Sequence, residues 1–268
     1  MDGFYGRTAL ITGASSGIGA ACAEVFAARG YDLVITARRE DRLRAAAERL
    51  ERQHGRRVHV IVGDLSQRHA VETLCDDIAA RGIAIDALVN NAGYGLPGGY
   101  SRSAWVEHDA FLQVMVVAVA ELTYRLLPGM VERGYGRIIN IASLAGLVPP
   151  SAGHTLYGAS KAFVIRFSQS LAAEVQHQGV HVTALCPGFT LSEFHDVNGM
   201  RAKVSKLPSF MWMDAPTVAR LGFDAVESGD PIYIPGRVNA AIARLSQLLP
   251  AALVSAVNHR ISRKFRRV

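Results

Sequence analysis

Residues 8–19 read TALITGASSGIG, a short apolar run followed at once by a glycine-rich turn, and a helical pattern over residues 20–29 comes next. A diphosphate can approach a glycine-rich backbone closely, and the free amide groups at the start of a helix bind it. The stretch therefore predicts a strand, a nucleotide-binding turn and a helix. The residues expected to contact the nucleotide here are Gly13, Ser15, Ser16, Gly17, Ile18 and Gly19.

Six more short apolar runs, rich in valine and isoleucine, follow along the chain, and helical stretches separate them. Their hydrophobicity is continuous, which is typical of strands covered on both faces, as in a parallel sheet. The alternation of strand and helix predicts a doubly wound α/β fold with ligands at the carboxyl ends of the strands. The expected strands are residues 8–12, 32–36, 58–62, 87–89, 137–141, 181–185 and 231–234. The expected helices are residues 20–29, 41–54, 67–80, 104–133 and 156–178.

The composition favours one globular unit in a reducing compartment. A chain of 268 residues, 50% of them hydrophobic, can bury a large core, and a single domain is expected over residues 1–239. The three cysteines, Cys22, Cys75 and Cys186, are widely spaced in apolar stretches, which favours reduced thiols over disulfides or a metal site. The chain shows neither a basic region leading into an apolar one nor an uninterrupted apolar run of about 18 residues, so we expect a cytoplasmic protein.

The net charge of +6 is concentrated in two places, Arg38–Arg57 and Arg260–Arg267. A charge so localised gives little support for general nucleic-acid binding. Residues 240–268 are expected to form an apolar and basic C-terminal extension. Such a segment suits peripheral contact with an anionic membrane, and it suits equally a helix packed over the substrate site with a solvated basic end.

Further polar and glycine motifs follow the later strands, at the ends where ligands are expected. They are Asp64-Leu65, Asn90-Asn91-Ala92-Gly93, Ser143, Tyr157-x3-Lys161 and Pro187-Gly188. Together with the glycine turn, these motifs resemble those of the short-chain dehydrogenase/reductase family, over roughly residues 7–235. The resemblance implies a Rossmann-type domain with seven parallel strands that binds NAD or NADP. The cofactor contacts that it implies are Asp64 and Leu65 near the adenine, Asn91, Ala92 and Gly93 beside the central strands, Pro187 and Gly188 at the nicotinamide, and Tyr157 and Lys161 near its ribose.

Tyr157 and Lys161 are four residues apart in a helical stretch, so both side chains lie on one face of the helix. Reduction of a carbonyl needs a proton donor, but a free phenol, with a pKa of about 10, is a poor partner near neutral pH. The Lys161 ammonium is expected to lower the pKa of Tyr157, and Ser143 can hydrogen-bond the substrate oxygen. Ser143, Tyr157 and Lys161 are therefore the expected catalytic residues.

The second strand ends in Thr36-Ala37-Arg38-Arg39, with Ala37 where an NAD enzyme usually carries an acid. No carboxylate then repels the 2′-phosphate of NADP, and Arg38 can hold this group through charge-assisted hydrogen bonds. Arg39 either assists or is merely solvated. The sequence predicts that NADP(H) is preferred over NAD(H).

The family resembled often has an asparagine in the long helix before the fifth strand, where it completes a proton relay to the lysine. Met115 stands at that place, and no asparagine occurs between Asn91 and Asn140. A thioether cannot donate a hydrogen bond. Met115 thus slightly favours an alternative, a nucleotide-binding regulator or scaffold without turnover, whereas the intact catalytic residues favour an enzyme.

Residues 189–214 interrupt the regular alternation, which predicts either a lid over an apolar substrate or an ordinary helical excursion. Leu191, Phe194, Met200, Leu207, Phe210, Met211, Trp212 and Met213 either line a substrate pocket or pack elsewhere. The candidate small-molecule substrates are 3-oxoacyl thioesters, steroid-like ketones and varied carbonyl compounds. Apolar side chains of the long helices, Val114, Val117, Leu122, Phe163, Phe167 and Leu171, predict a homodimer or homotetramer.

Overall fold

Seven parallel strands form the main sheet in the computed structural model, which describes residues 4, 6–96, 98–150, 155–191 and 211–248. The strand order is β3-β2-β1-β4-β5-β6-β9, and the strand register is parallel at each step. This order confirms the doubly wound fold, because the direction of winding switches between β1 and β4. The bounds are β1 Thr8–Thr12, β2 Asp32–Ala37, β3 Val58–Val62, β4 Ala87–Asn90, β5 Gly136–Ile141, β6 Val180–Leu185 and β9 Ile232–Tyr233.

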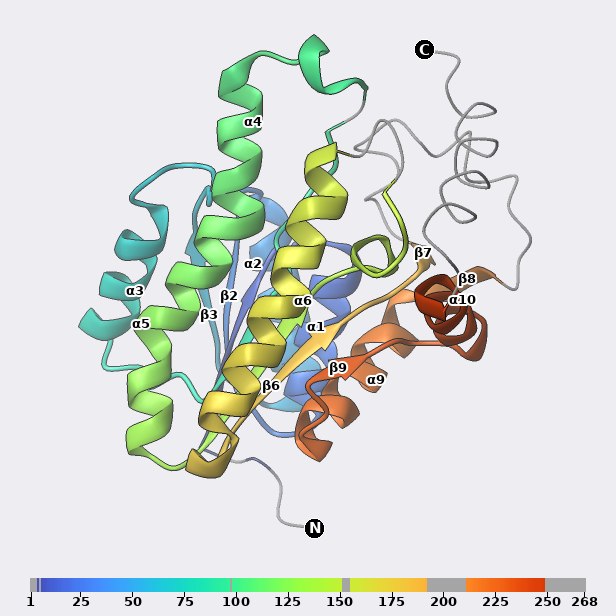
Figure 1. The fold of residues 1–268 in the computed structure, drawn as a ribbon. Coiled ribbons are helices and arrows are strands. Elements are labelled where there is room, and N and C mark those ends of the chain that lie inside the picture. Colours follow the sequence, from blue (N-terminus) through green and yellow to red (C-terminus); the bar gives the residue numbers. More distant parts are fainter. Residues whose placement is uncertain (1–3, 5, 97, 151–154, 192–210, 249–268) are drawn as a thin grey trace.

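Helices cover both faces of this sheet (Figure 1). Neighbouring residues of β1 enter different cores: Ala9 and Ile11 pack with one helical layer, and Leu10 packs with the other. Burial on both faces explains why the strand sequences are continuously apolar. One layer contains α1 (Gly17–Ala28), α2 (Glu40–His54) and α9 (Ala215–Ser228), and the other contains α3 (Ala70–Ala80), α4 (Trp105–Leu112), α5 (Ala118–Glu132) and α6 (Thr155–Val175).

The predicted helix over residues 104–133 is present but contains one wider turn. α4 runs through a π-helical turn, η2 (Gln113–Val117), directly into α5. Among the helices described, Trp105–Glu132 is long and apolar enough, by length and composition alone, to cross a membrane. Its residues Phe111, Leu122 and Met130 are, however, buried inside the domain. These contacts identify it as a core helix of the α/β fold.

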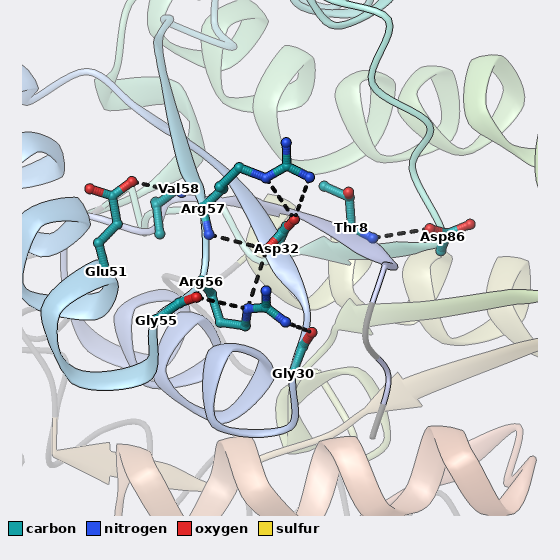
Figure 2. A network of polar contacts seen from close by, with 9 residues as sticks. All are labelled: Thr8, Gly30, Asp32, Glu51, Gly55, Arg56, Arg57, Val58 and Asp86. Atoms are coloured by element: carbon teal, nitrogen blue, oxygen red, sulfur yellow. Dashed lines mark hydrogen bonds and ion pairs between the residues drawn. The ribbon is translucent and has the colours of Figure 1, made fainter. Parts of the chain in front are cut away.

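Two buried aspartates join strands at the amino ends of the sheet (Figure 2). Asp32, which begins β2, accepts hydrogen bonds from the backbone amide and the Nε of Arg57, both at 3.1 Å. Asp86, just before β4, accepts one from the Thr8 amide at 3.0 Å and one from Arg133 Nε at 3.1 Å. The Asp86 bonds anchor β1 to the start of β4, and the Asp32 bonds anchor β2 to the residue before β3. All of them lie at the amino ends of the strands, away from the carboxyl ends where ligands are expected.

Two short strands and the C-terminal helix complete the described chain. β7 (Phe189–Leu191) and β8 (Trp212–Asp214) pair in parallel, so they bring together the two ends of the predicted 189–214 segment. α10 (Arg237–Leu248) lies beside β8 (Figure 1). α10 begins before residue 240, where the extension was expected to start, and the basic tail lies outside the described residues. The short 3-10 helices are η1 (Tyr100–Arg102), η3 (Leu144–Gly146) and η4 (Gln176–Gln178).

Candidate active site

The glycine turn between β1 and α1 forms a tight backbone cradle. Gly13 and Gly17 have φ of +67° and +56°, a region that residues with a side chain rarely adopt. A Cβ on Gly19 would collide with the Gly13 carbonyl and the Asn91 amide. The N-cap residue of α1, Ser16, makes no side-chain capping bond, so the amides of the first helical turn remain available to an anion.

The turn of Asn90 to Gly93, after β4, lies against the glycine turn as expected. Thr12 Oγ1 accepts hydrogen bonds from the amides of Asn91 (2.9 Å) and Ala92 (3.0 Å). The Asn91 side chain donates to the Thr12 carbonyl at 2.9 Å. These bonds hold two cofactor-facing turns of the predicted site together.

Two arginines follow β2, and their surroundings differ. Arg39 donates to Ser15 Oγ at 2.9 Å and to Ser16 Oγ at 2.8 Å, so it is not merely solvated. Arg38 is exposed, and its charge opposes the rise that burial causes in the pKa of Tyr94. Both cations therefore lie at the end of the sheet that carries the glycine turn.

Thr36 of β2, which pairs with β3, carries a buried polar atom without a partner among the described residues. Thr36 Oγ1 is buried without a hydrogen bond within the described part of the chain, and a Cβ on Gly63 would lie 3.6 Å from it. Asp64, next in sequence, accepts a hydrogen bond from the Ser66 amide at 3.0 Å. Leu65 packs in the core, so any contact that it makes with a nucleotide involves its backbone.

Ser143 and Tyr157 come together beyond the carboxyl end of β5. Ser143 Oγ accepts a hydrogen bond from the Ala145 amide at 3.1 Å and also bonds the Tyr157 side chain. Burial raises the pKa of Tyr157, and the bond to Ser143 opposes this rise. The expected lowering by Lys161 is therefore wrong: the pKa of Tyr157 is raised, and the group that opposes the rise is Ser143, while Lys161 Nζ lies 5.9 Å from the ring centre. Tyr157 is held as a neutral phenol, the form that can donate a proton.

Lys161 is a buried cation, only 6% exposed. Its Nζ donates to the Ile141 carbonyl at 2.6 Å and lies 5.9 Å from the centre of the Tyr157 ring. Burial lowers the pKa of Lys161 to about 8, and neighbouring Cys186 acts in the opposite direction. Burial raises the pKa of Cys186 to about 12, so that sulfur is a neutral thiol. A buried lysine of this kind is typical of functional sites.

A chain of buried polar groups joins α6, which carries Tyr157 and Lys161, to the sheet. Asn140 in β5 donates to Ser168 Oγ at 2.9 Å and accepts from Asn90 Nδ2 at 2.8 Å. Asn140 and Ser168 were not among the predicted site residues. The available signal was one polar residue inside the apolar strand RIINI. This chain sets the position of α6 relative to β4 and β5.

Met115 lies in the π-helical turn and is 1% exposed. A Cβ on Gly93 would lie 2.9 Å from the Met115 sulfur, so this side chain packs directly on the turn after β4. The thioether occupies space where the family often has an amide, and it offers no hydrogen-bond donor.

The Pro187–Gly188 turn after β6 is joined to the Ser143 loop. The Leu144 amide donates to the Pro187 carbonyl at 2.9 Å, and the Ser143 amide donates to Cys186. On its other side, Gly188 packs against Asn239 of α10. Asn239 was not selected from the sequence, because it belongs to no motif and lies far along the chain.

The residues present fit a nicotinamide dinucleotide. The glycine cradle suits a diphosphate, the arginines after β2 add positive charge, and the unpaired Thr36 hydroxyl could meet a polar ligand group. Within the described ranges, no group of three or more histidine, cysteine, aspartate or glutamate side chains could hold a metal ion.

Comparison with known proteins agrees with this geometry. The chain matches the family model described as short chain dehydrogenase over residues 7–201. Sulfoacetaldehyde reductase 2 of Chromohalobacter salexigens is 38% identical over 187 residues, which cover 69% of this chain and 73% of that protein. The NADP-dependent 3-hydroxy acid dehydrogenase of Escherichia coli is 37% identical over 180 residues, 67% of this chain and 71% of that protein. A solved short-chain dehydrogenase from Sphingobium yanoikuyae, in complex with NADPH, is 32% identical, with a TM-score of 0.78 over 98% of this chain and 96% of that chain. The chain therefore belongs to the short-chain dehydrogenase/reductase family of oxidoreductases.

Proposed function

We propose that the protein is an NADPH-dependent carbonyl reductase, or an alcohol dehydrogenase in the reverse direction, that acts on an apolar ketone, a 3-oxoacyl compound or a steroid-like substrate. The observation that carries the proposal is the bond between Ser143 and the half-buried Tyr157, whose pKa is raised, with Lys161 on the same helix. A proton donor and a dinucleotide cradle at one end of the sheet meet the needs of carbonyl reduction.

The cofactor is NADP(H). Ala37 leaves the end of β2 without a carboxylate, and Arg38 and Arg39 supply two positive charges there. Arg39 is already oriented toward the glycine turn by its bonds to Ser15 and Ser16. Arginines bind phosphate through short, charge-assisted hydrogen bonds. The NADP-dependent relative and the structural neighbour with NADPH support the same choice.

NADPH, when bound, supplies the hydride. Tyr157 donates its phenolic proton to the carbonyl oxygen, and burial favours this direction because it keeps the phenol protonated. Ser143 donates a hydrogen bond to the same oxygen and stabilises the negative charge that develops there. Lys161 stabilises the tyrosinate that remains after the proton leaves.

The apolar substrate class rests on the side chains at the two ends of the 189–214 segment. The Phe189 and Trp212 rings of β7 and β8 lie 5.6 Å apart, and the Leu191 side chain is exposed beside them. Aromatic and aliphatic side chains of this kind commonly line pockets for apolar ligands. Of the other predicted pocket residues in this segment, Met211 and Met213 are half-buried, and Phe194, Met200, Leu207 and Phe210 lie outside the described residues.

The test is the loss of NADPH absorbance when purified protein meets a panel of ketones, 3-oxoacyl thioesters and steroid ketones. We expect turnover with at least one apolar carbonyl, and a higher kcat/KM with NADPH than with NADH. NADPH binding without any turnover would favour the alternative, a nucleotide-binding regulator or scaffold. An equal or higher kcat/KM with NADH would contradict the cofactor assignment.

A homodimer or homotetramer is proposed from exposed apolar side chains on the long helices. Val117 and Phe163 remain exposed, as does Tyr124, whose exposed fraction is 78%. Three other residues predicted at the interface cannot contribute, because they are buried inside the chain. These are Val114, Leu122 and Leu171. Light scattering should show an oligomer that Tyr124→Glu weakens. A monomer at micromolar concentration would contradict this proposal.

A cytoplasmic location is proposed because Cys22, Cys75 and Cys186 are all free thiols. Contact of the C-terminal tail with an anionic membrane also stays a proposal. We expect the full chain to sediment with anionic liposomes more than a chain truncated before Arg260. Equal sedimentation of the two would refute it.

A further inference from the structure

The helix α10 contributes one buried amide, Asn239, beside the active site. Asn239 is only 5% exposed. Its Nδ2 donates to the Pro235 carbonyl at 2.8 Å and lies 4.0 Å from the Met213 sulfur of β8. The side chain is thus held from two directions. The family model ends at residue 201, so Asn239 lies beyond the matched region.

The carboxamide of Asn239 lies directly on Gly188. A Cβ built on Gly188 would meet Oδ1 of Asn239 at 2.5 Å, and Cγ and Nδ2 at 2.7 Å. These three atoms form one planar group, so the flat side of the carboxamide packs directly on the Gly188 Cα. Gly188 does not have a positive φ. Packing against Asn239, and not backbone conformation, therefore requires glycine here.

The opposite side of the same turn is bonded to the loop that carries Ser143 and to β9. The Pro187 carbonyl accepts the Leu144 amide at 2.9 Å, and the Cys186 amide donates to the Tyr233 carbonyl at 2.8 Å. The Pro187–Gly188 turn is therefore clamped between α10 and the Ser143 loop. A shift of Asn239 would displace the turn, because close-packed atoms transmit displacement.

We propose that Asn239 is a positioning residue that holds the Pro187–Gly188 turn in place against the nicotinamide and the Ser143 loop. The identity of that ring rests on the proposed function. Asn239 acts through its contact with Gly188, so it is a positioning residue and not a catalytic one. The groups that bind the phosphates, Arg39 and the glycine turn, lie elsewhere. Loss of Asn239 therefore slows hydride transfer more than it weakens cofactor binding.

The kinetic test compares Asn239→Ala and Asn239→Leu with the parent enzyme. Misplacement of reacting groups by about 1 Å can cost up to about a hundredfold in rate. We expect Asn239→Ala to lower kcat about tenfold while the NADPH Kd stays within about threefold. Asn239→Leu keeps a branched side chain on Gly188 and should retain most of kcat. Val238→Ala, on the same helix but 42% exposed, is the matched control and should change neither value.

A second test uses Gly188→Ala and needs no turnover. In the parent, the added methyl meets the Asn239 amide, so we expect a clear fall in Tm. In the Asn239→Ala background the three obstructing atoms are gone, and the same substitution should cost little. In the Asn239→Leu background a branched side chain again lies on Gly188, and the loss of Tm should return. NADPH emission reports on the surroundings of the nicotinamide, and we expect Asn239→Ala to alter it while Val238→Ala does not.

The outcomes separate this inference from the proposed function. Equal Tm losses for Gly188→Ala in the parent and in Asn239→Ala would overturn the inference, as would a kcat for Asn239→Ala within twofold of the parent. If the parent reduces no carbonyl, the proposed function fails. The Tm cycle and the NADPH emission then still decide the role of Asn239.

Discussion

Replacing Lys161 by methionine should abolish activity and at the same time stabilise the folded protein at neutral pH. Methionine has a similar length and no charge, so it fills the space of the buried lysine stem. The ammonium of Lys161 is buried and has one backbone partner, the Ile141 carbonyl. Removing a poorly compensated buried charge in favour of an apolar side chain is often stabilising.

The magnitude follows from the pKa of Lys161, which burial lowers from its ordinary 10.5 to about 8. At about 1.4 kcal/mol per pH unit, this difference corresponds to a folding penalty of about 3 kcal/mol. Losing the bond to Ile141 costs about 1 kcal/mol. The net gain for Lys161→Met is therefore about 2 kcal/mol in the free energy of unfolding.

The penalty depends on pH with a definite sign. Below pH 8 the lysine is charged in both the folded and unfolded states, so the full penalty is present. Between pH 8 and 10.5 the folded state loses its proton first, and the stability of the parent rises. Above that range both states are neutral. The advantage of Lys161→Met should therefore shrink steadily from pH 8 upward.

Urea unfolding of the cofactor-free protein at pH 7 and at several values up to pH 10 measures this difference. Arg166→Met, on the exposed side of the same helix, is the matched control, because it removes a cation that is not buried. It should show no stability gain that changes with pH. A Lys161→Met protein no more stable than the parent at pH 7, or a difference constant across the series, would refute the reasoning.

Three further substitutions test the site. Tyr157→Phe should lower kcat on the order of a hundredfold or more with NADPH affinity, followed by fluorescence, nearly unchanged; activity within threefold of the parent would mean that the proton comes from elsewhere. Arg39→Ala should raise the KM for NADPH about tenfold and leave that for NADH unchanged, since one charge-assisted contact is lost; equal effects on both cofactors would argue against a phosphate contact. Met115→Asn should leave kcat intact or raise it, but should lower the free energy of unfolding by about 1–3 kcal/mol because it buries an amide beside Gly93; a tenfold fall in kcat at unchanged stability would contradict this.

Most of the fold could be predicted because its signals are local. The strands are short apolar runs, and all seven predicted ranges differ from the observed bounds by one residue or less at each end. Tyr157 and Lys161 could be placed on one helix face from their spacing alone. The glycine turn could be placed because Gly13 and Gly17 supply backbone conformations that a side chain would strain.

Contacts between distant segments could not be predicted in this way. Apolar periodicity places a helix on a sheet but does not say that Asn140 meets Ser168, or which of two adjacent arginines turns toward the serines. The direction in which the pKa of Tyr157 shifts also depends on how deeply the phenol is buried, and motif spacing does not encode this.

The family, the doubly wound sheet and the candidate catalytic residues could all be predicted from the sequence alone, because these follow from periodicity, turn chemistry and motif spacing within short windows. Which groups support them depends on how the whole chain folds. The folded chain turned Arg39 toward the glycine turn, placed Met115 in a π-helical turn against Gly93, and laid Asn239 on Gly188. Each of these contacts joins residues from different elements, and their geometry exists only once the whole chain has packed.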